Sequence, residues 1–226
     1  MVIAPDFTLL LQPLLDMDSP VFPPAAVRQV CVHVLWGVVL AAAGWRMASV
    51  LQPPWRLALA ALMGVGSSLA GPLSPAYWLE LAFASPSWTS VLLCGLWLWG
   101  QTRSQARSSD IRTPRPTNSF PLPWVLCGIA MGWVLALDTF AALPVRHSLY
   151  ALGFSPLASL ILMVAAAATW VLSARWVHAL PLVALALFVL TRLPSGNVWD
   201  AVLDPLLWLY LHIHLASQGW RSLRAR

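Results

Sequence analysis

The amino-acid sequence predicts an all-α fold: a polytopic transmembrane bundle of about seven spans, with the N-terminus outside and the C-terminus in the cytoplasm. Hydrophobic residues make up 59% of the 226-residue chain, charged residues only 9%, and the mean hydropathy is +0.74. A water-soluble domain of this size could not expose so apolar a surface and remain dispersed. Long apolar runs recur along the chain, and its basic residues are distributed unevenly around them.

The segment 1–27 precedes the first apolar run and is expected to be extracytoplasmic. It lacks a basic start and is interrupted by several prolines, so it does not resemble a cleavable signal peptide. An interfacial helix around residues 7–15, followed by an extended proline-rich stretch, fits this composition.

A helix needs about 20 apolar residues to cross the hydrocarbon core of a bilayer. By this rule the sequence predicts seven spans: 28–50, 56–72, 87–101, 121–141, 156–174, 177–192 and 198–218. The second, third and sixth are short, which requires a locally thinned bilayer or neighbours that shield the helix ends. Residues 28–100 therefore hold spans one to three, and residues 121–218 hold spans four to seven.

Four segments connect or follow these spans. The proline-bounded stretch 71–87 is too short to cross, so an outer interfacial or re-entrant helix is expected near 75–84. The outer loop 142–156 has a similar composition. Residues 101–120 are rich in Arg, Ser, Thr and Pro and read as a basic cytoplasmic linker, and residues 219–226 form a basic cytoplasmic tail.

The orientation follows from the arginines, because basic residues in short loops are retained on the cytoplasmic side. With the N-terminus outside, ten arginines lie inside and three lie outside. The inner ones are Arg46, Arg56, Arg103, Arg107, Arg112, Arg115, Arg175, Arg221, Arg224 and Arg226. The acids show the opposite bias, since Asp110 is the one acidic residue expected inside.

Several residue patterns bear on helix packing. The pairs Gly128/Gly132 and Gly64/Ser68 are spaced by four residues, which permits close helix approach. Three tryptophans near the middle of spans are expected to pack between helices: Trp36, Trp133 and Trp208. The PSGN stretch at 194–197 predicts a turn that opens the last span.

Several reaction classes are excluded or lack a motif. The chain contains no lysine, which excludes lysine Schiff-base chemistry, including a retinal linkage. It also lacks the H-E-x-x-H, G-x-S-x-G, Walker A and dinucleotide-binding patterns. Whether the protein is an enzyme is left open by the sequence.

The last predicted span carries an unusual set of polar residues. If it were one straight helix, a rotation of about 100° per residue would align five of them in a single stripe. These are Asn197, Asp200, Asp204, His214 and Gln218. His212 and His214 would point about 200° apart and could not chelate one metal ion, so no metal site is expected. Haem ligation would need a depth-matched histidine such as His178, so a chain without a cofactor is favoured and haem is the weaker alternative.

Asp204 is the strongest candidate for a functional residue. An acid at membrane depth costs about 2.5–3.5 kcal/mol on insertion scales unless it is paired or hydrated. Pro205 lacks an N–H and would free the carbonyl of residue 201 within a continuous helix. Asp204 could pair with Arg192 or Arg146 and lock helices together, or it could line an outward-facing polar cavity.

The cavity interpretation defines a set of candidate site residues. The catalytic candidates are Asp204, Asp138 and His147. The binding candidates are Asp200, Asn197, Arg146, Arg192, Glu80 and His214. An aspartate would act as the acid or base, while an arginine would hold an anionic headgroup.

Two functions are compatible with these observations. The first is a non-catalytic membrane component, such as a subunit, a scaffold or a transport-related protein, in which Asp204→Asn destabilises the fold. The second is a membrane enzyme or carrier that acts on a lipid-linked or amphiphilic substrate at the outer leaflet, in which Asp204→Asn abolishes activity and spares folding. The sequence favours the first because the second lacks a recognisable motif.

The composition also predicts partners and location. Membrane lipids and other membrane subunits are the expected partners, and nucleic acid is not. Long apolar spans, short connections and the lack of a signal peptide fit a multi-pass protein of the bacterial cytoplasmic (inner) membrane.

Overall fold

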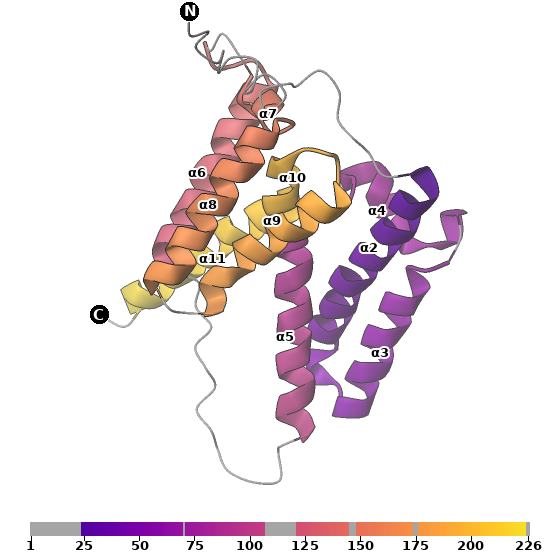
Figure 1. Cartoon of the computed structure of the whole chain (residues 1–226). Helices are drawn as coiled ribbons and strands as arrows, with labels where there is room; N and C mark the ends of the chain where they lie inside the picture. Colours follow the sequence, from indigo (N-terminus) through magenta and orange to yellow (C-terminus); the bar gives the residue numbers. More distant parts are fainter. Residues whose placement is uncertain (1–23, 70, 107–120, 145–147, 174–175, 225–226) are drawn as a thin grey trace, which may run out of the picture.

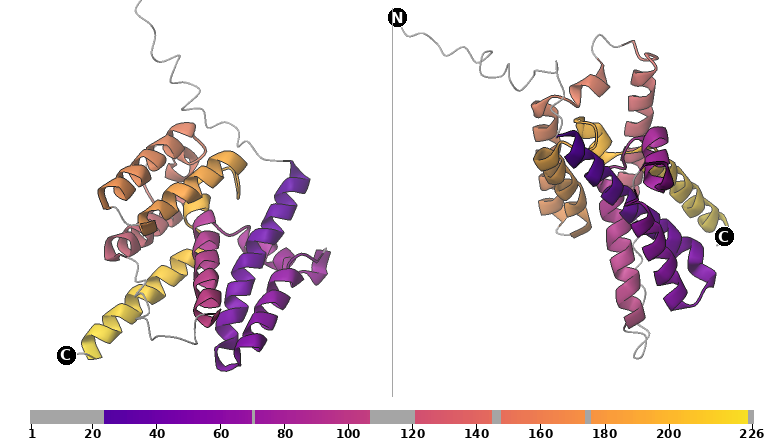
Figure 2. Two further views of the ribbon diagram at one scale, coloured as in Figure 1. Left: turned by 60° about the horizontal axis from the view of Figure 1, so that its bottom comes forward. Right: turned by 90° about the vertical axis from the view of Figure 1, so that its right-hand side faces the viewer.

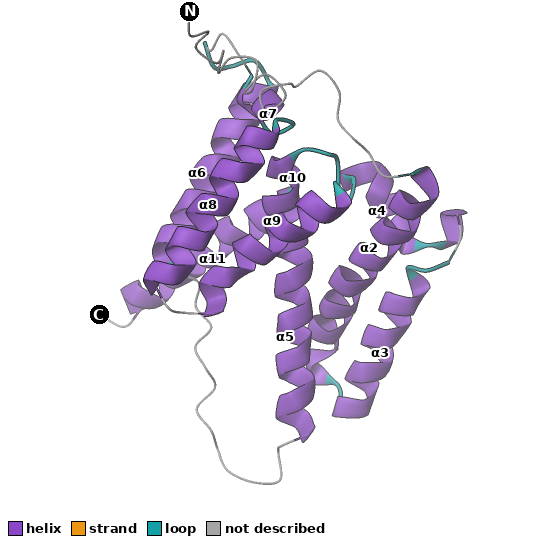
Figure 3. Ribbon diagram, viewed as in Figure 1, coloured by secondary structure: helices purple, strands orange, loops and turns teal. Residues whose placement is uncertain are grey.

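The computed structural model describes residues 24–69, 71–106, 121–144, 148–173 and 176–224. Within these ranges 84% of the residues are helical and none lies in a strand, which confirms the predicted all-α class. Figure 1 shows the arrangement of the helices, and Figure 3 shows the loops that join them. The predicted interfacial helix near 7–15 and most of the predicted linker lie outside the described residues.

The described ranges contain seven helices of at least twelve residues, one for each predicted span. They are α2 (Ala25–Met47), α3 (Pro53–Gly66), α5 (Trp88–Ala106), α6 (Leu122–Thr139), α8 (Pro156–Ser173), α9 (Leu180–Thr191) and α11 (Pro205–Arg224). Shorter elements lie between them: η1 (Ala48–Val50), η2 (Gly71–Leu73), α4 (Pro75–Phe83), α7 (Leu149–Leu152), η3 (Trp176–Ala179) and α10 (Val198–Val202).

Three of the helical segments are long and apolar enough to cross a membrane. They are Ala25–Val50, Leu122–Thr139 and Pro156–Ser173. Their large apolar side chains are extensively exposed, as on a surface that lipid covers. The described residues therefore include three helices that could cross a membrane.

The helices α2 and α3 pack closely through small residues. A Cβ atom on Gly37 would lie 2.7 Å from Ser67 Oγ, and one on Gly64 would lie 3.3 Å from the Ala41 Cβ. The predicted close approach at Gly64 is thus confirmed, but Ser67 lies in the contact in place of the predicted Ser68, which is exposed. Ser67 donates a hydrogen bond to the Gly64 carbonyl at 2.5 Å, which satisfies its buried hydroxyl.

A second close approach joins α6 to α11. A Cβ on Gly132 would lie 2.3 Å from the Trp208 indole, and one on Gly128 would lie 2.6 Å from Leu211 Cδ1. Trp208 donates from Nε1 to the Ile129 carbonyl at 3.2 Å. The glycine pair predicted for close packing therefore serves this interface.

The three mid-span tryptophans differ in their environments. Trp36 is 1% exposed in a core with Val32 and Ala76, and Trp208 packs on α6, so the prediction that they pack between helices is confirmed. Trp133 is 51% exposed and contacts the Trp208 ring at 5.1 Å between centroids. About half of its surface is therefore not covered by the described part of the protein.

The helices are offset along their long axes. Figures 1 and 2 show α5 projecting past the ends of α6, α8 and α9, while its first turns contact α9 and α10. Trp88 packs against the core formed by Ala166, Leu185 and Phe188. The first residue of α5 therefore lies against the core that α8 and α9 form.

The last predicted span is not one helix, which corrects the sequence analysis. The helix α10 ends at Val202, Leu203 is extended with φ −140° and ψ 125°, and α11 begins at Pro205. Asp-Pro is a helix-start signal, since aspartate is a favoured N-cap and proline a favoured first residue. The proline starts a helix and does not interrupt one, and the predicted polar stripe across residues 197–218 does not form.

The helix α11 also extends further than predicted. It continues to Arg224, so most of the predicted tail 219–226 is helical. Arg224 lies over the Trp220 ring at 4.9 Å, a cation–π contact between residues four apart. The pair stabilises the last turn.

Candidate functional site

Asp204 lies at the break between α10 and α11 and is 6% exposed. Its Oδ1 accepts a hydrogen bond from the Leu207 N–H at 2.7 Å, so the side chain caps α11. Its Oδ2 accepts from the Ser87 N–H, also at 2.7 Å, at the start of α5. The carboxylate therefore lies between the N-terminal ends of two helices, whose partial positive charges stabilise an anion.

No arginine among the described residues forms an ion pair with Asp204. Arg192 instead ends α9 with φ 56°, and its guanidinium lies over the Phe188 ring at 5.7 Å. The predicted pairing of Asp204 with Arg192 is therefore wrong. Two backbone N–H groups bind the carboxylate without the cost of desolvating a second charge. The other predicted partner, Arg146, lies outside the described residues, as does His147.

The backbone just before α5 reaches the middle of α2. The Nε1 of Trp36, the twelfth residue of that 23-residue helix, donates to the Ala84 carbonyl at 3.0 Å. Ala84 has φ 58° at the end of α4. The irregular residues 84–87 are thus held by Trp36 on one side and by Asp204 on the other.

A second polar cluster joins α6 and α7. Asp138, at the end of α6, is 9% exposed. Its Oδ2 accepts from the Ser148 hydroxyl and from the Tyr150 N–H, both at 2.7 Å. The carboxylate thereby satisfies donors at the start of α7, and Ser148 accepts in turn from the Ala151 N–H.

The same cluster continues to α10 through Tyr150. The Tyr150 hydroxyl donates to Asp200 Oδ2 at 2.7 Å, and the Ser195 hydroxyl donates to the same oxygen. Asn197 is fully buried, donates from Nδ2 to the Tyr150 carbonyl at 2.8 Å and caps α10 by accepting from the Trp199 N–H. The predicted turn at 194–197 is confirmed, and its residues connect α7 to α10.

The structure brings some candidate residues together and separates others. Asp138, Asp200 and Asn197 all bind Tyr150, whereas Asp204 belongs to a separate contact. Glu80 lies partly exposed on α4, and His214 lies on α11 with Gln218 Nε2 at 2.8 Å from its Nε2.

Sequence reasoning missed four residues of these contacts. They are Ser87, Ser148, Tyr150 and Ser195. The available signal for the serines was local, because serine is a favoured cap and turn residue. Tyr150 carried no local signal, since its role depends on a contact 50 residues away.

The metal-binding capacity of the described residues is low. No three side chains of His, Cys, Asp or Glu come together there as ligands for one ion. His212 Nδ1 lies 2.8 Å from the Trp208 carbonyl, whereas His214 contacts Tyr210 and Gln218. The two imidazoles therefore have different neighbours.

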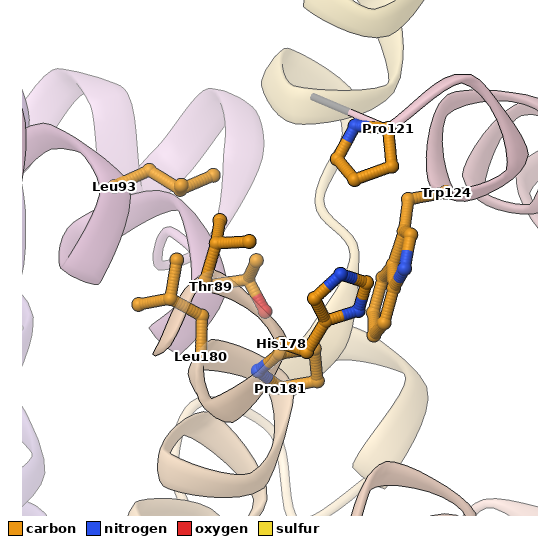
Figure 4. Close-up of a pocket in the computed structure, with 8 residues that line it drawn as sticks. Thr89, Leu93, Pro121, Trp124, His178, Leu180 and Pro181 are labelled. Carbon is orange, nitrogen blue, oxygen red and sulfur yellow. The ribbon is translucent and has the colours of Figure 1, made fainter. Parts of the chain in front are cut away.

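A pocket lies where the start of α5 meets α6, η3 and α9. It is lined by Thr89, Leu93, Pro121, Trp124, Val177, His178, Leu180 and Pro181 (Figure 4). The predicted spans place Thr89 near the outer end of one helix and His178 near the inner end of another, yet both line this pocket. The sequence could not predict this proximity, because apolar runs define helix length and carry no information on axial offset.

We expect Tyr150→Phe to destabilise the protein in a pH-dependent way. Burial and the Asp200 carboxylate raise the pKa of the Tyr150 phenol. The folded state therefore keeps this proton above pH 10, where an unfolded tyrosine of pKa about 10 loses it, and the stability contribution falls as pH rises. At pH 8 the variant should lose about 1 kcal/mol of unfolding free energy, the value of one hydrogen bond.

The measurement is equilibrium unfolding in mixed detergent micelles at several pH values from 8 to 11. The difference between Tyr150→Phe and wild type should narrow above pH 10. Tyr77→Phe, which removes a hydroxyl from α4, serves as the matched control and should behave like wild type. A difference that stays constant with pH would contradict the role assigned to the Tyr150 hydroxyl.

The fold and these contacts define a helical protein with three helices able to cross a membrane. Comparisons with protein-family models, with curated proteins and with solved structures found no match.

Proposed function

We propose that the protein is a non-catalytic component of the bacterial cytoplasmic membrane: a subunit, scaffold or transport-related protein that binds other membrane subunits. The observation that carries the proposal is the use of Asp204. Both of its oxygens accept hydrogen bonds from backbone N–H groups, one just before α5 and one in the first turn of α11. An acid held in this way stabilises packing and is poorly placed to exchange protons with a substrate.

The proposed topology is a multi-pass bundle of about seven spans with the N-terminus outside and the C-terminus inside. Arginines near the C-terminal ends of three helices support a common cytoplasmic side. They are Arg46 on α2, Arg103 on α5, and Arg221 and Arg224 on α11. Arg103 lies over the Trp99 ring at 4.5 Å, a pairing suited to the membrane interface.

Within this topology the segment 71–87 is re-entrant. The bond from Trp36 to the Ala84 carbonyl supports a position of this segment near the middle of the bilayer. Non-helical backbone is tolerated at that depth where protein satisfies its polar groups, and Trp36 and Asp204 do so here. A re-entrant segment also explains the axial offset of α5, which then starts within the bilayer.

The test is native mass spectrometry of protein extracted gently from its own membrane, combined with thermal melting of the purified protein. We expect a partner chain at fixed stoichiometry and a lower melting temperature for Asp204→Asn. Glu80→Gln, a matched change of a partly exposed acid, should retain the wild-type melting temperature.

The enzyme or carrier alternative predicts a different pattern. The protein would be isolated without a partner chain but with a bound lipid-linked molecule. Asp204→Asn would lose that molecule and keep the wild-type melting temperature. This combination would overturn the proposed function.

A further inference from the structure

The pocket between the two halves of the chain contains polar groups without partners. Within the described residues, five buried side-chain atoms have no hydrogen-bond partner, and two of them, Thr89 Oγ1 and His178 Nδ1, belong to residues that line this pocket. Figure 4 shows the Thr89 hydroxyl oxygen directed toward the imidazole of His178, whose ring lies against Trp124. The centroids of the Trp124 and His178 rings are 5.3 Å apart. Buried polar groups in folded proteins are nearly always satisfied, so these two atoms indicate a missing partner.

The pocket has the electrostatic character of a site for an acceptor oxygen. The N-terminal ends of α5, α6 and α9 converge on it through Thr89, Pro121 and Leu180. Helix N-terminal ends carry partial positive charge and favour an electron-rich atom. The hydroxyl of Thr89 and a neutral imidazole can each donate one hydrogen bond to such an atom.

The remaining lining limits what kind of molecule can present that oxygen. Among the described residues, no acid or arginine lines the pocket, and every lining side chain other than those of Thr89 and His178 is apolar or aromatic. A charged ligand would therefore lose its hydration without a counter-charge. The cavity of about 50 Å³ has room for a carbonyl and the carbons next to it, so the apolar body of the ligand extends outward.

We propose that this pocket binds the carbonyl oxygen of an uncharged, lipid-soluble molecule, with Thr89 and His178 as its hydrogen-bond donors and Trp124 against its apolar part. The carbonyl has two possible sources, the ring of an isoprenoid quinone and the ester group of a neutral lipid. Because this ligand bridges α5 to α6 and η3, it joins the two halves of the chain. The proposal does not depend on the proposed function.

The test is isothermal titration calorimetry of the full-length protein in phosphatidylcholine nanodiscs. Decylubiquinone and dioctanoylglycerol are titrated separately, and we expect one of them to bind saturably. Thr89→Val and His178→Leu should each weaken this binding about five- to tenfold, the effect of one lost hydrogen bond. Binding of decylubiquinone assigns the site to a quinone ring, and binding of dioctanoylglycerol assigns it to an ester group.

Thr169→Val is the matched control, because its hydroxyl bonds the Ala166 carbonyl of its own helix, outside the pocket. It should bind as wild type does. If His178→Leu does not fold, Thr89→Val, which preserves side-chain shape, decides the result. The proposal is overturned if neither compound binds saturably, or if the wild-type affinity survives in a folded Thr89→Val protein.

Discussion

Replacing Asp204 with alanine should lower the free energy of unfolding by about 2–4 kcal/mol. Loss of an N-cap costs about 1 kcal/mol, and a buried N–H left without a partner costs about 1–3 kcal/mol. Asp204→Ala imposes both costs, since it removes the acceptors of the Leu207 and Ser87 N–H groups. The expected result is a large shift in equilibrium unfolding monitored by tryptophan fluorescence in mixed micelles.

The control for this experiment is Glu80→Ala, which removes a partly exposed acid from α4. Its unfolding free energy should lie within about 0.5 kcal/mol of wild type, as for most surface changes. An Asp204→Ala protein as stable as the Glu80→Ala protein would show that the carboxylate does not connect α5 and α11.

Gly153→Ala should be the second most damaging substitution, with an expected loss of about 3 kcal/mol, at the upper end of the usual cost of overpacking. A Cβ atom at this position would lie 1.9 Å from Asn197 Oδ1 and 2.4 Å from the Trp199 ring. Asn197 cannot move aside, because its side chain is fully buried and bonded to Tyr150 and Trp199. Thermal melting and unfolding in mixed micelles would measure the loss.

Gly100→Ala provides the matched control. This glycine lies within α5, and a Cβ there would meet nothing within 4 Å. Alanine is a better helix former than glycine by about 0.8–1.0 kcal/mol, so the control should be as stable as wild type or more stable. Equal destabilisation by the two substitutions would contradict the close contact at Gly153.

The sequence predicted the helices better than their arrangement. Each of the first six predicted spans overlaps one long helix, because an apolar run of sufficient length is a strong local signal, whereas the last predicted span is divided between α10 and α11. Gly64, Gly128 and Gly132 were also located correctly at close helix contacts, since small residues at four-residue spacing act through local geometry.

The arrangement depends on contacts that no local pattern encodes. The axial offset of α5 accompanies its packing on α9 and α10, and the pocket at Thr89 and His178 lies where α5 meets η3 and α9. The break before Pro205 was predictable in principle, because Asp-Pro is a helix-start signal. The continuous apolar character of residues 198–218 obscured it.

The sequence predicted which acids are important better than it predicted the groups that bind them. Asp138, Asp200 and Asp204 are all buried or partly buried acids that connect elements. Sequence reasoning paired Asp204 with arginine because opposite charge is the partner visible in a sequence. Backbone N–H groups are present at every residue except proline, and only folding selects those of Ser87 and Leu207.

The bond between Ser87 and Asp204 also has a consequence for biosynthesis. Its two residues are 117 positions apart, and a ribosome adding about 5–20 residues per second needs roughly 6–23 s to cover that interval. During this interval the Ser87 N–H has already been synthesised, but its acceptor, Asp204, has not been translated. The start of α5 therefore cannot form this native contact until the chain has been made as far as Asp204.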